Sequence, residues 1–391
     1  MQKNSNCYWF RFFICYFTGN NAVIGLLAMH IEIVTDTYAP DVNGAAKSLG
    51  YLVDSLSNMG CVVRMICPQP VSAIRLPSIR VPGYDSVQVA WVSRRELRER
   101  WQTKRPNAVY IGMESVIGCS ALKVANDLGI ITLAGFHTNF HQYARSWKLP
   151  LLAETAFKLM RWFHNRASAT MVPSISVRNE LKAAGFENLH VMGRGVDVCQ
   201  FSPSNRCPKL RNKWGANGDD PVAIFIARIS PEKNMGLLAE VFKVMRELNP
   251  RVKCVVVGDG PSQESFADEN PEVYCTKFLV GEDLTSAYAS ADILIFPSMT
   301  ETFGNTVTEA MASGLVTVAY DYAAANMHIR DNLSGLLVPF GDHERFLQRS
   351  IEALNHVNNT QMRQSASSDV SDVSWEKVAR KVLATIELNT G

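Results

Sequence analysis

The sequence lacks the residue spacings that mark three common kinds of site. Its nine cysteines include no Cys-x-x-Cys pair and no regular spacing, which argues against zinc and disulfide frameworks and favours a reducing compartment. It has no Asp-x-Asp pair, so no obvious carboxylate pair is present for a metal bound to a diphosphate. The dinucleotide fingerprint is also missing: Gly258 and Gly260 supply two of its glycines, but Pro261 interrupts it and Gln263 occupies the third position. A nicotinamide-dependent enzyme is therefore disfavoured.

The apolar stretch near the N-terminus is too short to cross a bilayer. Residues 8–17 are apolar and aromatic, but Arg11 interrupts them and Asn20 and Asn21 end them, and a signal-peptide cleavage pattern is missing. We interpret residues 1–28 as an extension outside the fold, either an upstream extension of the reading frame or a disordered tail. A membrane-contacting segment and a cleaved signal peptide are the alternatives.

The small net charge of +2 conceals an uneven distribution. Residues 1–200 carry 21 Lys and Arg against 13 Asp and Glu, whereas residues 201–391 carry 18 against 24. We therefore expect the first half to meet an anionic partner. Nucleic acid is disfavoured as that partner, because the acidic second half offsets the positive charge.

Short apolar runs alternate with helical patterns along the whole chain of 391 residues. Buried strands are predicted at 31–35, 62–67, 108–113, 131–137, 169–173, 222–227, 253–258, 273–278, 293–297, 317–320 and 336–339. Helices are predicted at 44–59, 93–104, 116–128, 151–165, 174–184, 235–248, 284–289, 306–311 and 343–354. This alternation predicts an α/β protein with two Rossmann-like, doubly wound parallel-sheet domains that face each other across a cleft.

The boundary between the two domains is expected in segment 195–205, which contains Pro, Ser and Gly and separates the basic first half from the acidic second half. We predict an N-terminal acceptor domain over 29–198 and a C-terminal nucleotide-binding domain over 199–360. Residues 361–391 are expected to form a linker and a final helix. Because the pattern at 375–388 is amphipathic, this helix should pack back on the N-terminal domain.

Candidate ligand-binding residues in the first half follow predicted strands, where parallel sheets bind their ligands. Gly44 lies beside a helix start, where backbone amides can approach a phosphate or a sugar closely. An ordinary strand-to-helix turn is the alternative. His137 ends the fourth predicted strand and can donate to a sugar hydroxyl or a phosphate oxygen. A purely structural histidine is the stronger alternative for a single residue of this type.

The second half carries a cationic pair and a carboxylate pair. Arg228 directly follows a predicted strand and Lys233 lies five residues on, so both can meet phosphate oxygens. Glu301 follows the strand at 293–297, and Glu309 lies one turn inside the next helix. A solvated turn and a capping pair are the alternatives. An enzyme that acts on nucleotide sugars needs carboxylates that bind sugar hydroxyls and, beside them, cations that bind a diphosphate.

These motifs, in this order and spacing, resemble those of the large retaining glycosyltransferase family 4, whose members have the GT-B fold. The resemblance runs over about residues 29–390. It is carried by Pro40 with Gly44, 136–138, 172–174, 195–197 with Phe201, 227–234, 258–261, 290–298, 301–314 and 335–338. Segments 136–145 and 194–197 further resemble the branch that contains GDP-mannose-dependent α-mannosyltransferases and sulfoquinovosyl-lipid synthases.

The resemblance implies a role for each candidate. Arg228 and Lys233 would hold the donor diphosphate, Glu309 the ribose, and Glu301 the donor sugar. The remaining implied contacts to the donor come from the amides near Phe303, Gly304 and Asn305, and from His137 and Gly44 in the other domain. Two departures from the family pattern bear on specificity. Family members often carry paired glycines where this chain has Asn43 and Gly44. They also often carry Gly-Gly followed by Glu where this chain has three alanines at 323–325.

The resemblance implies transfer of a hexosyl group with retention at the anomeric carbon, with mannose from GDP-mannose the preferred donor. A UDP-sugar-dependent glycolipid synthase is the main alternative, followed by a nucleotide-sugar epimerase and a non-catalytic sugar-nucleotide-binding protein. No cofactor or metal is expected, because cationic side chains and a helix terminus can neutralise the leaving diphosphate. The chain shows no clear nucleophile for a double displacement, which favours attack on the same face of the sugar.

The acceptor is predicted less directly. Two basic and aromatic stretches could lie on anionic lipid, which favours a lipid or glycan acceptor and an enzyme that is cytoplasmic or peripheral on the cytoplasmic face of a membrane. These stretches contain Arg94, Arg95, Arg98, Arg100, Lys104 and Arg105 beside Trp91 and Trp101, and Lys158, Arg161, Trp162, Phe163 and Arg166. Solvated helices packed on the sheet are the alternative.

Overall fold

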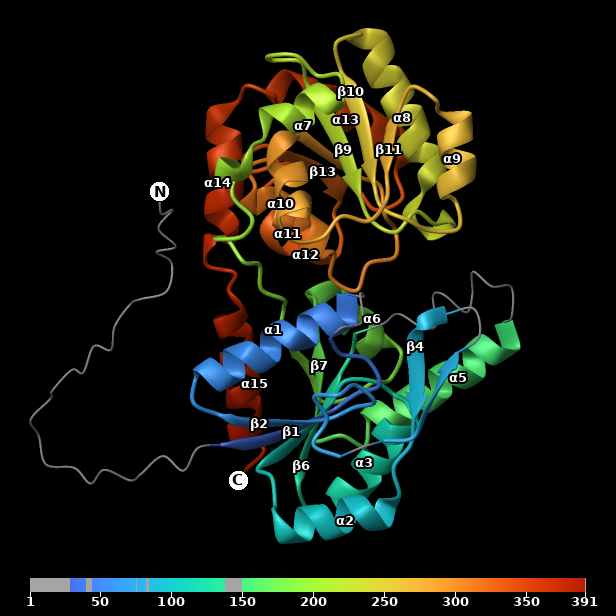
Figure 1. The fold of residues 1–391 in the computed structure, drawn as a ribbon, viewed down its shortest axis with the longest axis vertical. Coiled ribbons are helices and arrows are strands. Elements are labelled where there is room, and N and C mark those ends of the chain that lie inside the picture. Colours follow the sequence, from blue (N-terminus) through green and yellow to red (C-terminus); the bar gives the residue numbers. More distant parts are fainter. Residues whose placement is uncertain (1–28, 40–43, 75, 82–83, 138–149, 391) are drawn as a thin grey trace, which may run out of the picture.

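A computed structural model describes residues 29–39, 44–74, 76–81, 84–137 and 150–390. The expectations for residues 1–28, for Pro40 and Asn43, and for 138–145 lie outside the described residues. The chain forms two α/β lobes, one above the other, each built on a parallel sheet (Figure 1). We call them the N-terminal and the C-terminal lobe.

The N-terminal lobe contains six parallel strands in the order β2-β1-β5-β6-β7-β8. They are β1 (His30–Val34), β2 (Val62–Ile66), β5 (Ala108–Ile111), β6 (Ile131–Gly135), β7 (Ala169–Val172) and β8 (Leu189–Val191). The central strands are buried on both faces, which explains their near-continuous apolar sequences. The sequence did not predict β8, which has only three residues, or the antiparallel hairpin of β3 (Ser78–Val81) and β4 (Tyr84–Ala90).

Helices connect these strands along the chain. They are α1 (Gly44–Asn58), α2 (Arg94–Thr103), α3 (Val116–Asp127), α5 (Pro150–His164) and α6 (Ile175–Ala183). A serine caps three of them: the side chains of Ser93, Ser115 and Ser174 each accept a hydrogen bond from a backbone N–H in the first turn. Their starts are therefore determined locally by the sequence.

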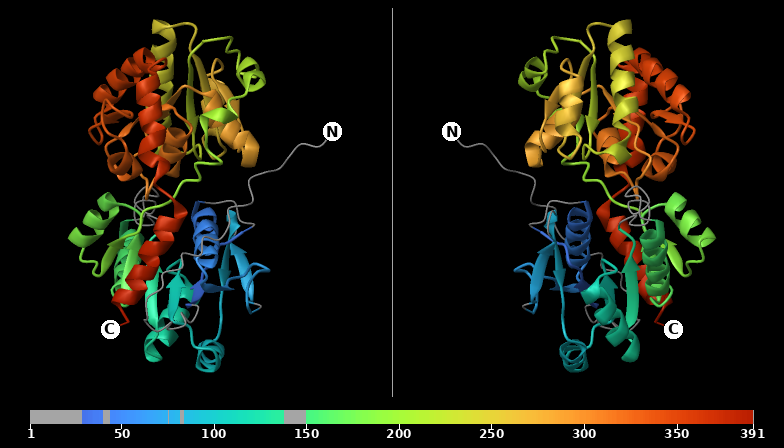
Figure 2. Two further views of the ribbon diagram at one scale, coloured as in Figure 1. Left: turned by 90° about the vertical axis from the view of Figure 1, so that its left-hand side faces the viewer. Right: turned by 90° about the vertical axis from the view of Figure 1, so that its right-hand side faces the viewer.

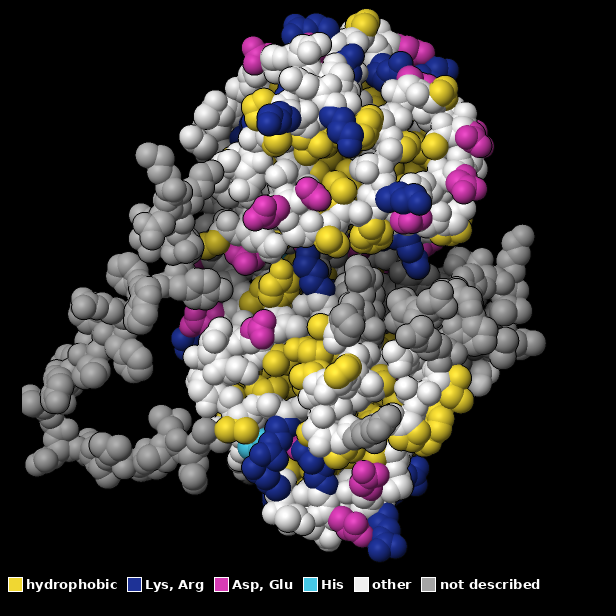
Figure 3. Space-filling view, viewed as in Figure 1, with side chains coloured by type: hydrophobic (Ala, Val, Ile, Leu, Met, Phe, Trp, Pro, Cys, Tyr) yellow, Lys and Arg dark blue, Asp and Glu magenta, His cyan; other side chains and the backbone are white. Residues whose placement is uncertain are grey.

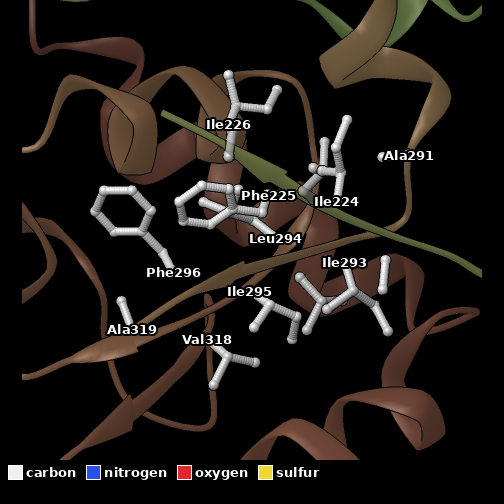
Figure 4. Packing of buried hydrophobic residues seen from close by; sticks show 14 of the residues in the cluster. Ile224, Phe225, Ile226, Ala291, Ile293, Leu294, Ile295, Phe296, Val318 and Ala319 are labelled. Carbon is white, nitrogen blue, oxygen red and sulfur yellow. The ribbon is translucent and has the colours of Figure 1, made fainter. Parts of the chain in front are cut away.

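The C-terminal lobe contains six parallel strands in the order β11-β10-β9-β12-β13-β14. They are β9 (Val222–Ile226), β10 (Lys253–Val257), β11 (Tyr274–Thr276), β12 (Ile293–Phe296), β13 (Val316–Tyr320) and β14 (Leu336–Val338). Phe225, Leu294, Ile295 and Val318 belong to the buried core that covers the two faces of this sheet (Figure 4). This core holds the loops that follow β9 and β12 in fixed positions.

The helices of this lobe include several that the sequence did not predict. They are α7 (Pro208–Lys213), α8 (Met235–Leu248), α9 (Gln263–Glu269), α10 (Gly281–Ser290), α11 (Asn305–Ala312), α12 (Ala323–His328), α13 (His343–Ala353) and α14 (Thr360–Ser371), with short 3-10 turns at Pro203–Asn205, Pro231–Lys233 and Leu354–His356. The stretch expected to be a linker is helical in α14. Its Met362, Ala366 and Val370 are spaced four residues apart and are buried against the C-terminal lobe.

The last helix, α15 (Trp375–Leu388), returns to the N-terminal lobe. Its Trp375, Val378 and Val382 are buried in the same core as Ile31 and Leu52. Figures 1 and 2 show α14 beside the C-terminal lobe and α15 beside the N-terminal lobe.

The two chain crossings between the lobes lie side by side. The backbone N–H of Val196 donates to the carbonyl of Val373 at 2.8 Å. A side chain at Gly195 would place its Cβ only 2.3 Å from the backbone nitrogen of Trp375. The close approach of the two segments therefore requires glycine at this position.

Both sheets reverse their strand order at one point, between β1 and β5 in the N-terminal lobe and between β9 and β12 in the C-terminal lobe. Ligands of open α/β sheets bind at the carboxyl ends of strands beside such a reversal. Lys and Arg side chains lie at the waist between the lobes in the space-filling view (Figure 3). The fold therefore places two potential binding edges beside the same waist.

Candidate active site

Lys233 and Glu301 meet at the strand reversal of the C-terminal lobe. Lys233 ends the short turn after β9, and Glu301 lies in the loop after β12. The Lys233 ammonium contacts Oε1 of Glu301 and lies 3.3 Å from Oγ of Ser298, whose hydroxyl donates to the same carboxylate oxygen at 2.7 Å. Lys233 is only 8% exposed, so this ion pair is shielded from water.

Arg228 lies in the same loop as Lys233 but is oriented differently. Its guanidinium pairs with Glu232 in the same turn, and about half of its side chain is exposed. The structure therefore places the two predicted cations beside the same strand end, with Lys233 buried and Arg228 nearer to solvent.

Glu309, on α11, has partners from both lobes. Its Oε2 accepts a hydrogen bond from the hydroxyl of Tyr288 at 2.8 Å, and its Oε1 lies 3.1 Å from the ammonium of Lys47 on α1. Burial raises the pKa of Tyr288, so this hydroxyl keeps its proton and donates. The ion pair between Lys47 and Glu309 shows that this carboxylate faces the other lobe.

The start of α11 lies beside Glu301. Gly304 has φ of +91°, and a Cβ there would lie 3.5 Å from Cγ of Glu301. The ring of Phe303 is buried against His328, so its backbone is the part left for a ligand. Asn305 begins the helix, and its buried Oδ1 has no hydrogen-bond partner in the described part of the chain. Glu301, Phe303 and Gly304 line a small pocket together with Phe296, Ser298, Val307, Ala319, Tyr320, Tyr322 and Ala325.

His137 follows β6 in the N-terminal lobe and contacts other protein groups through both ring nitrogens. Its Nε2 lies 3.0 Å from the hydroxyl of Tyr110, and its Nδ1 lies 3.5 Å from Nη2 of Arg194. Because a guanidinium only donates, Nδ1 must accept, and the ring proton resides on Nε2. Burial, reinforced by the charge of Arg194, lowers the pKa of His137 to about 3, so the ring is neutral at physiological pH.

Gly44 and Arg194 meet at the start of α1. Nη1 of Arg194 donates to Oγ of Ser48 at 2.7 Å and to the carbonyl of Gly44 at 3.4 Å. Sequence reasoning included Arg194 in the segment 194–197 that resembles one branch of the family but did not select it as a site residue, because an arginine after a three-residue strand carries no spacing signal. Its neighbours come from segments that are far apart in the chain.

The two groups of residues face each other across the waist. Burial lowers the pKa of Arg194 to about 10, while Tyr110 and the carboxylate of Glu301 act in the opposite direction. Glu301 is thus close enough to interact with Arg194 electrostatically. The fold therefore brings Lys233 and Glu301 of one lobe together with Arg194 and His137 of the other.

The basic stretch of α2 is largely neutralised within the N-terminal lobe. Arg100 pairs with buried Glu32, which also accepts a hydrogen bond from the buried indole of Trp101 at 2.9 Å. Arg95 pairs with Glu99, and Arg98 with Asp127. These contacts favour the alternative of a helix packed on the sheet for this stretch.

On α5, by contrast, Trp162 is 44% exposed and Leu159 is 54% exposed. The guanidinium of Arg166 lies over the ring of Trp162 at 4.3 Å. Within the described residues, no helix combines the length and the apolar character needed to cross a membrane.

Comparison with known proteins identifies the family. Residues 207–368 match the family described as glycosyl transferases group 1, and residues 42–200 match Glycosyltransferase Family 4. A GDP-mannose-dependent alpha-mannosyltransferase of Mycolicibacterium smegmatis is 31% identical over 83% of this chain and 88% of its own length. The enzyme of the same description from Mycobacterium tuberculosis is 29% identical over 94% of this chain and 98% of its own length. An alpha-monoglucosyldiacylglycerol synthase of Streptococcus pneumoniae is 25% identical over 81% and 76%.

A solved structure supports the same fold. The chain superimposes on HepE from Anabaena, crystallised in complex with UDP, with a TM-score of 0.70 at 16% identity, covering 92% of this chain and all of the other. The predicted GT-B fold is thereby confirmed. The protein is a transferase that acts on nucleotide sugars, and it belongs to the family 4 glycosyltransferases of the GT-B fold.

Proposed function

We propose that this enzyme transfers mannose from GDP-mannose to a lipid or glycan acceptor, with retention at the anomeric carbon and without a metal ion. The donor follows from the two mannosyltransferase relatives, of which one is 31% identical to this chain. The single observation that carries the site is the buried Lys233–Glu301 pair at the strand reversal, facing Arg194 and His137 of the other lobe.

In this proposal the C-terminal lobe binds most of the donor. Lys233 and Arg228 hold the diphosphate, Glu309 holds the ribose, and Glu301 with the amides near Phe303, Gly304 and Asn305 holds the sugar. Two ion pairs must then change partners. The ribose displaces Lys47 from Glu309, and the sugar and diphosphate separate Lys233 from Glu301.

The proposed chemistry is a same-face displacement. The bond between the anomeric carbon and the phosphate oxygen breaks, the acceptor oxygen bonds to the anomeric carbon, and the acceptor proton passes to the leaving phosphate oxygen. Lys233 and the amide end of α11 stabilise the negative charge that develops on the diphosphate. Neutral His137 supplies no charge, and its contacts with Tyr110 and Arg194 hold the opposite wall of the cleft. A trapped covalent glycosyl-enzyme would contradict this chemistry.

A lipid acceptor would be reached from the N-terminal lobe. The excess of positive charge in residues 1–200 and the exposed Trp162 beside Arg166 on α5 suit contact with an anionic membrane on the cytoplasmic side. Co-sedimentation with phosphatidylglycerol vesicles, compared with phosphatidylcholine vesicles, tests this part. Equal binding to both would contradict it.

Thermal unfolding of the purified protein tests the donor. The protein is heated with GDP, UDP and ADP and with their sugar conjugates, once with EDTA and once with Mg²⁺. A ligand present at about a hundred times its dissociation constant adds roughly 2.7 kcal/mol of stability. We expect stabilisation by GDP and GDP-mannose that is the same with EDTA. A response to UDP conjugates alone would instead indicate a UDP-sugar-dependent glycolipid synthase, and a requirement for Mg²⁺ would contradict a metal-independent site.

A further inference from the structure

Arg194 is a buried cation without a counter-ion among the described residues. Its side chain is 4% exposed, and it takes part in none of the ion pairs found in the described ranges. Its contacts are with neutral groups: Oγ of Ser48, the carbonyl of Gly44 and Nδ1 of His137. A buried charge of this kind costs folding free energy unless an opposite charge compensates it.

The hydrogen-bond geometry leaves one edge of the guanidinium available. Nη1 uses its two hydrogens on Ser48 and Gly44, and Nη2 uses one on His137. Nε has no partner in the described part of the chain, although it is fully buried. The Nε–H and the second Nη2–H therefore remain, and these are the groups with which arginine binds two oxygens of one anion.

Glu301 does not fill this role. Its carboxylate is near enough to influence Arg194, but Oε1 is held by Lys233 and by the hydroxyl of Ser298. Ser48, which Arg194 contacts, directly follows Lys47, and Lys47 pairs with Glu309 of the other lobe, so Arg194 lies beside the cleft between the lobes. A ligand with two negative charges at this place would compensate both Arg194 and Lys233.

We propose that Arg194 binds oxygens of the donor diphosphate from the N-terminal lobe, opposite Lys233 and Arg228. This assignment rests on the proposed function, since it requires a nucleotide-sugar donor in the cleft. Because Arg194 precedes the crossing at Gly195, a diphosphate held by Arg194 and Lys233 also links the two lobes. The charge on the leaving group is then stabilised from both sides.

Calorimetric titration of the full-length protein with GDP, GMP and guanosine tests the assignment. Arg194→Gln should weaken GDP binding about 10- to 100-fold and leave guanosine binding unchanged, because charged hydrogen bonds to the diphosphate are lost. Arg194→Lys keeps the charge but not the two-donor edge, so it should give an intermediate loss. Arg345→Gln, at an exposed arginine on α13, is the matched control and should bind like the wild type.

Each other outcome has a defined meaning. If the wild type binds GDP and both Arg194 variants bind it equally well, the assignment is wrong while the proposed donor stands. If GDP binding is unchanged and only the acceptor KM rises, Arg194 serves an anionic acceptor and the assignment is again wrong. If the wild type binds neither GDP nor UDP, the proposed function fails, and the assignment fails with it. Should Arg194→Gln unfold, Arg194→Lys alone decides.

Discussion

Lys233 has two tasks in the proposed site. It holds Glu301 in place within the C-terminal lobe, and it offers a shielded positive charge where the leaving diphosphate is proposed to lie. Lys233→Ala should therefore lower kcat by about 10²–10³-fold, the usual loss when one preorganised charge-stabilising group is removed. Steady-state rates at saturating donor and acceptor provide the measurement.

The matched control is Lys243→Ala, at an exposed lysine on α8, which should keep the wild-type rate. Unfolding midpoints of both variants separate a catalytic loss from a folding defect. A Lys233→Ala variant that is folded and turns over at the wild-type rate would remove Lys233 from the site.

His137 should make stability depend on pH in acid. Its pKa is about 3 in the folded protein against 6.5 in the unfolded chain, so the unfolded state binds one more proton between these values. Stability is therefore unaffected by this group above pH 6.5 and falls as the pH drops below it, with a slope of up to about 1.4 kcal/mol per pH unit.

His137→Gln isolates this contribution, because glutamine can also accept from Arg194 and donate to Tyr110 without titrating. The comparison with the wild type is needed because burial also lowers the pKa of His328, to about 4. Urea unfolding at pH 7, 6, 5 and 4 should give a flatter pH profile for the variant. Parallel profiles would show that the pKa of His137 is not lowered in the folded state.

Among the site residues, the sequence predicted those that lie at the ends of strands, and it missed a residue whose contacts depend on the tertiary structure. Lys233 and Glu301 follow neighbouring strands of one sheet, so their approach follows from the alternation pattern. The neighbours of Arg194 come instead from the start of α1 and the end of β6, and no local pattern brings these segments together.

The start of α11 depends on glycine at position 304. Its φ of +91° lies in the left-handed region that disfavours other residues. Gly304→Ala should cost about 1 kcal/mol or more and should raise the donor KM, because the strain moves the amides that precede Glu309. Gly304→Asn should recover part of the loss, since asparagine tolerates this conformation better.

Gly50→Ala is the matched control, because a Cβ at this helical position meets no atom within 4 Å. It should be neutral or stabilising by about 0.5–1 kcal/mol. Calorimetric unfolding and donor KM values measured on all three variants test the idea. Equal effects of Gly304→Ala and Gly50→Ala would show that position 304 is unstrained.

Helices and strands with a clear pattern of apolar residues were predicted from the sequence, whereas those with a weak pattern were not. The central strands of both sheets are short apolar runs rich in Val and Ile, as expected of parallel strands that are buried on both faces. Helix α14 has three buried apolar positions among Ser, Gln and Asp, so its sequence resembles a linker. The β3–β4 hairpin pairs outside the main sheets and leaves Ile79 exposed. Its sequence therefore lacks the apolar run that marks a buried strand.

For the whole molecule, the return of α15 makes the N-terminal lobe depend on the end of the chain. Trp375 is 8% exposed, and its ring stacks on Tyr51 of α1 with the centroids 5.2 Å apart. The same residue lies against Gly195 at the crossing, so it supports both the core and the link between the lobes. The amphipathic pattern at 375–388 predicted that this helix needs an apolar surface to cover. The contact of Trp375 with Gly195 was not predictable, because it depends on two chain crossings that only the complete fold brings together.

Trp375→Ala should therefore destabilise the N-terminal lobe more than the C-terminal lobe. The loss of a large buried ring costs about 3–5 kcal/mol, whereas Trp162→Ala, at an exposed tryptophan on α5, should change stability by less than about 0.5 kcal/mol. Hydrogen exchange should show faster exchange in β1 and α1 of the Trp375 variant, while β9 and β12 keep their protection because their core contains no part of α15. If exchange increased equally in both lobes, the lobes would unfold as one unit, and the ion pair of Lys47 with Glu309 and the double crossing would have to couple them.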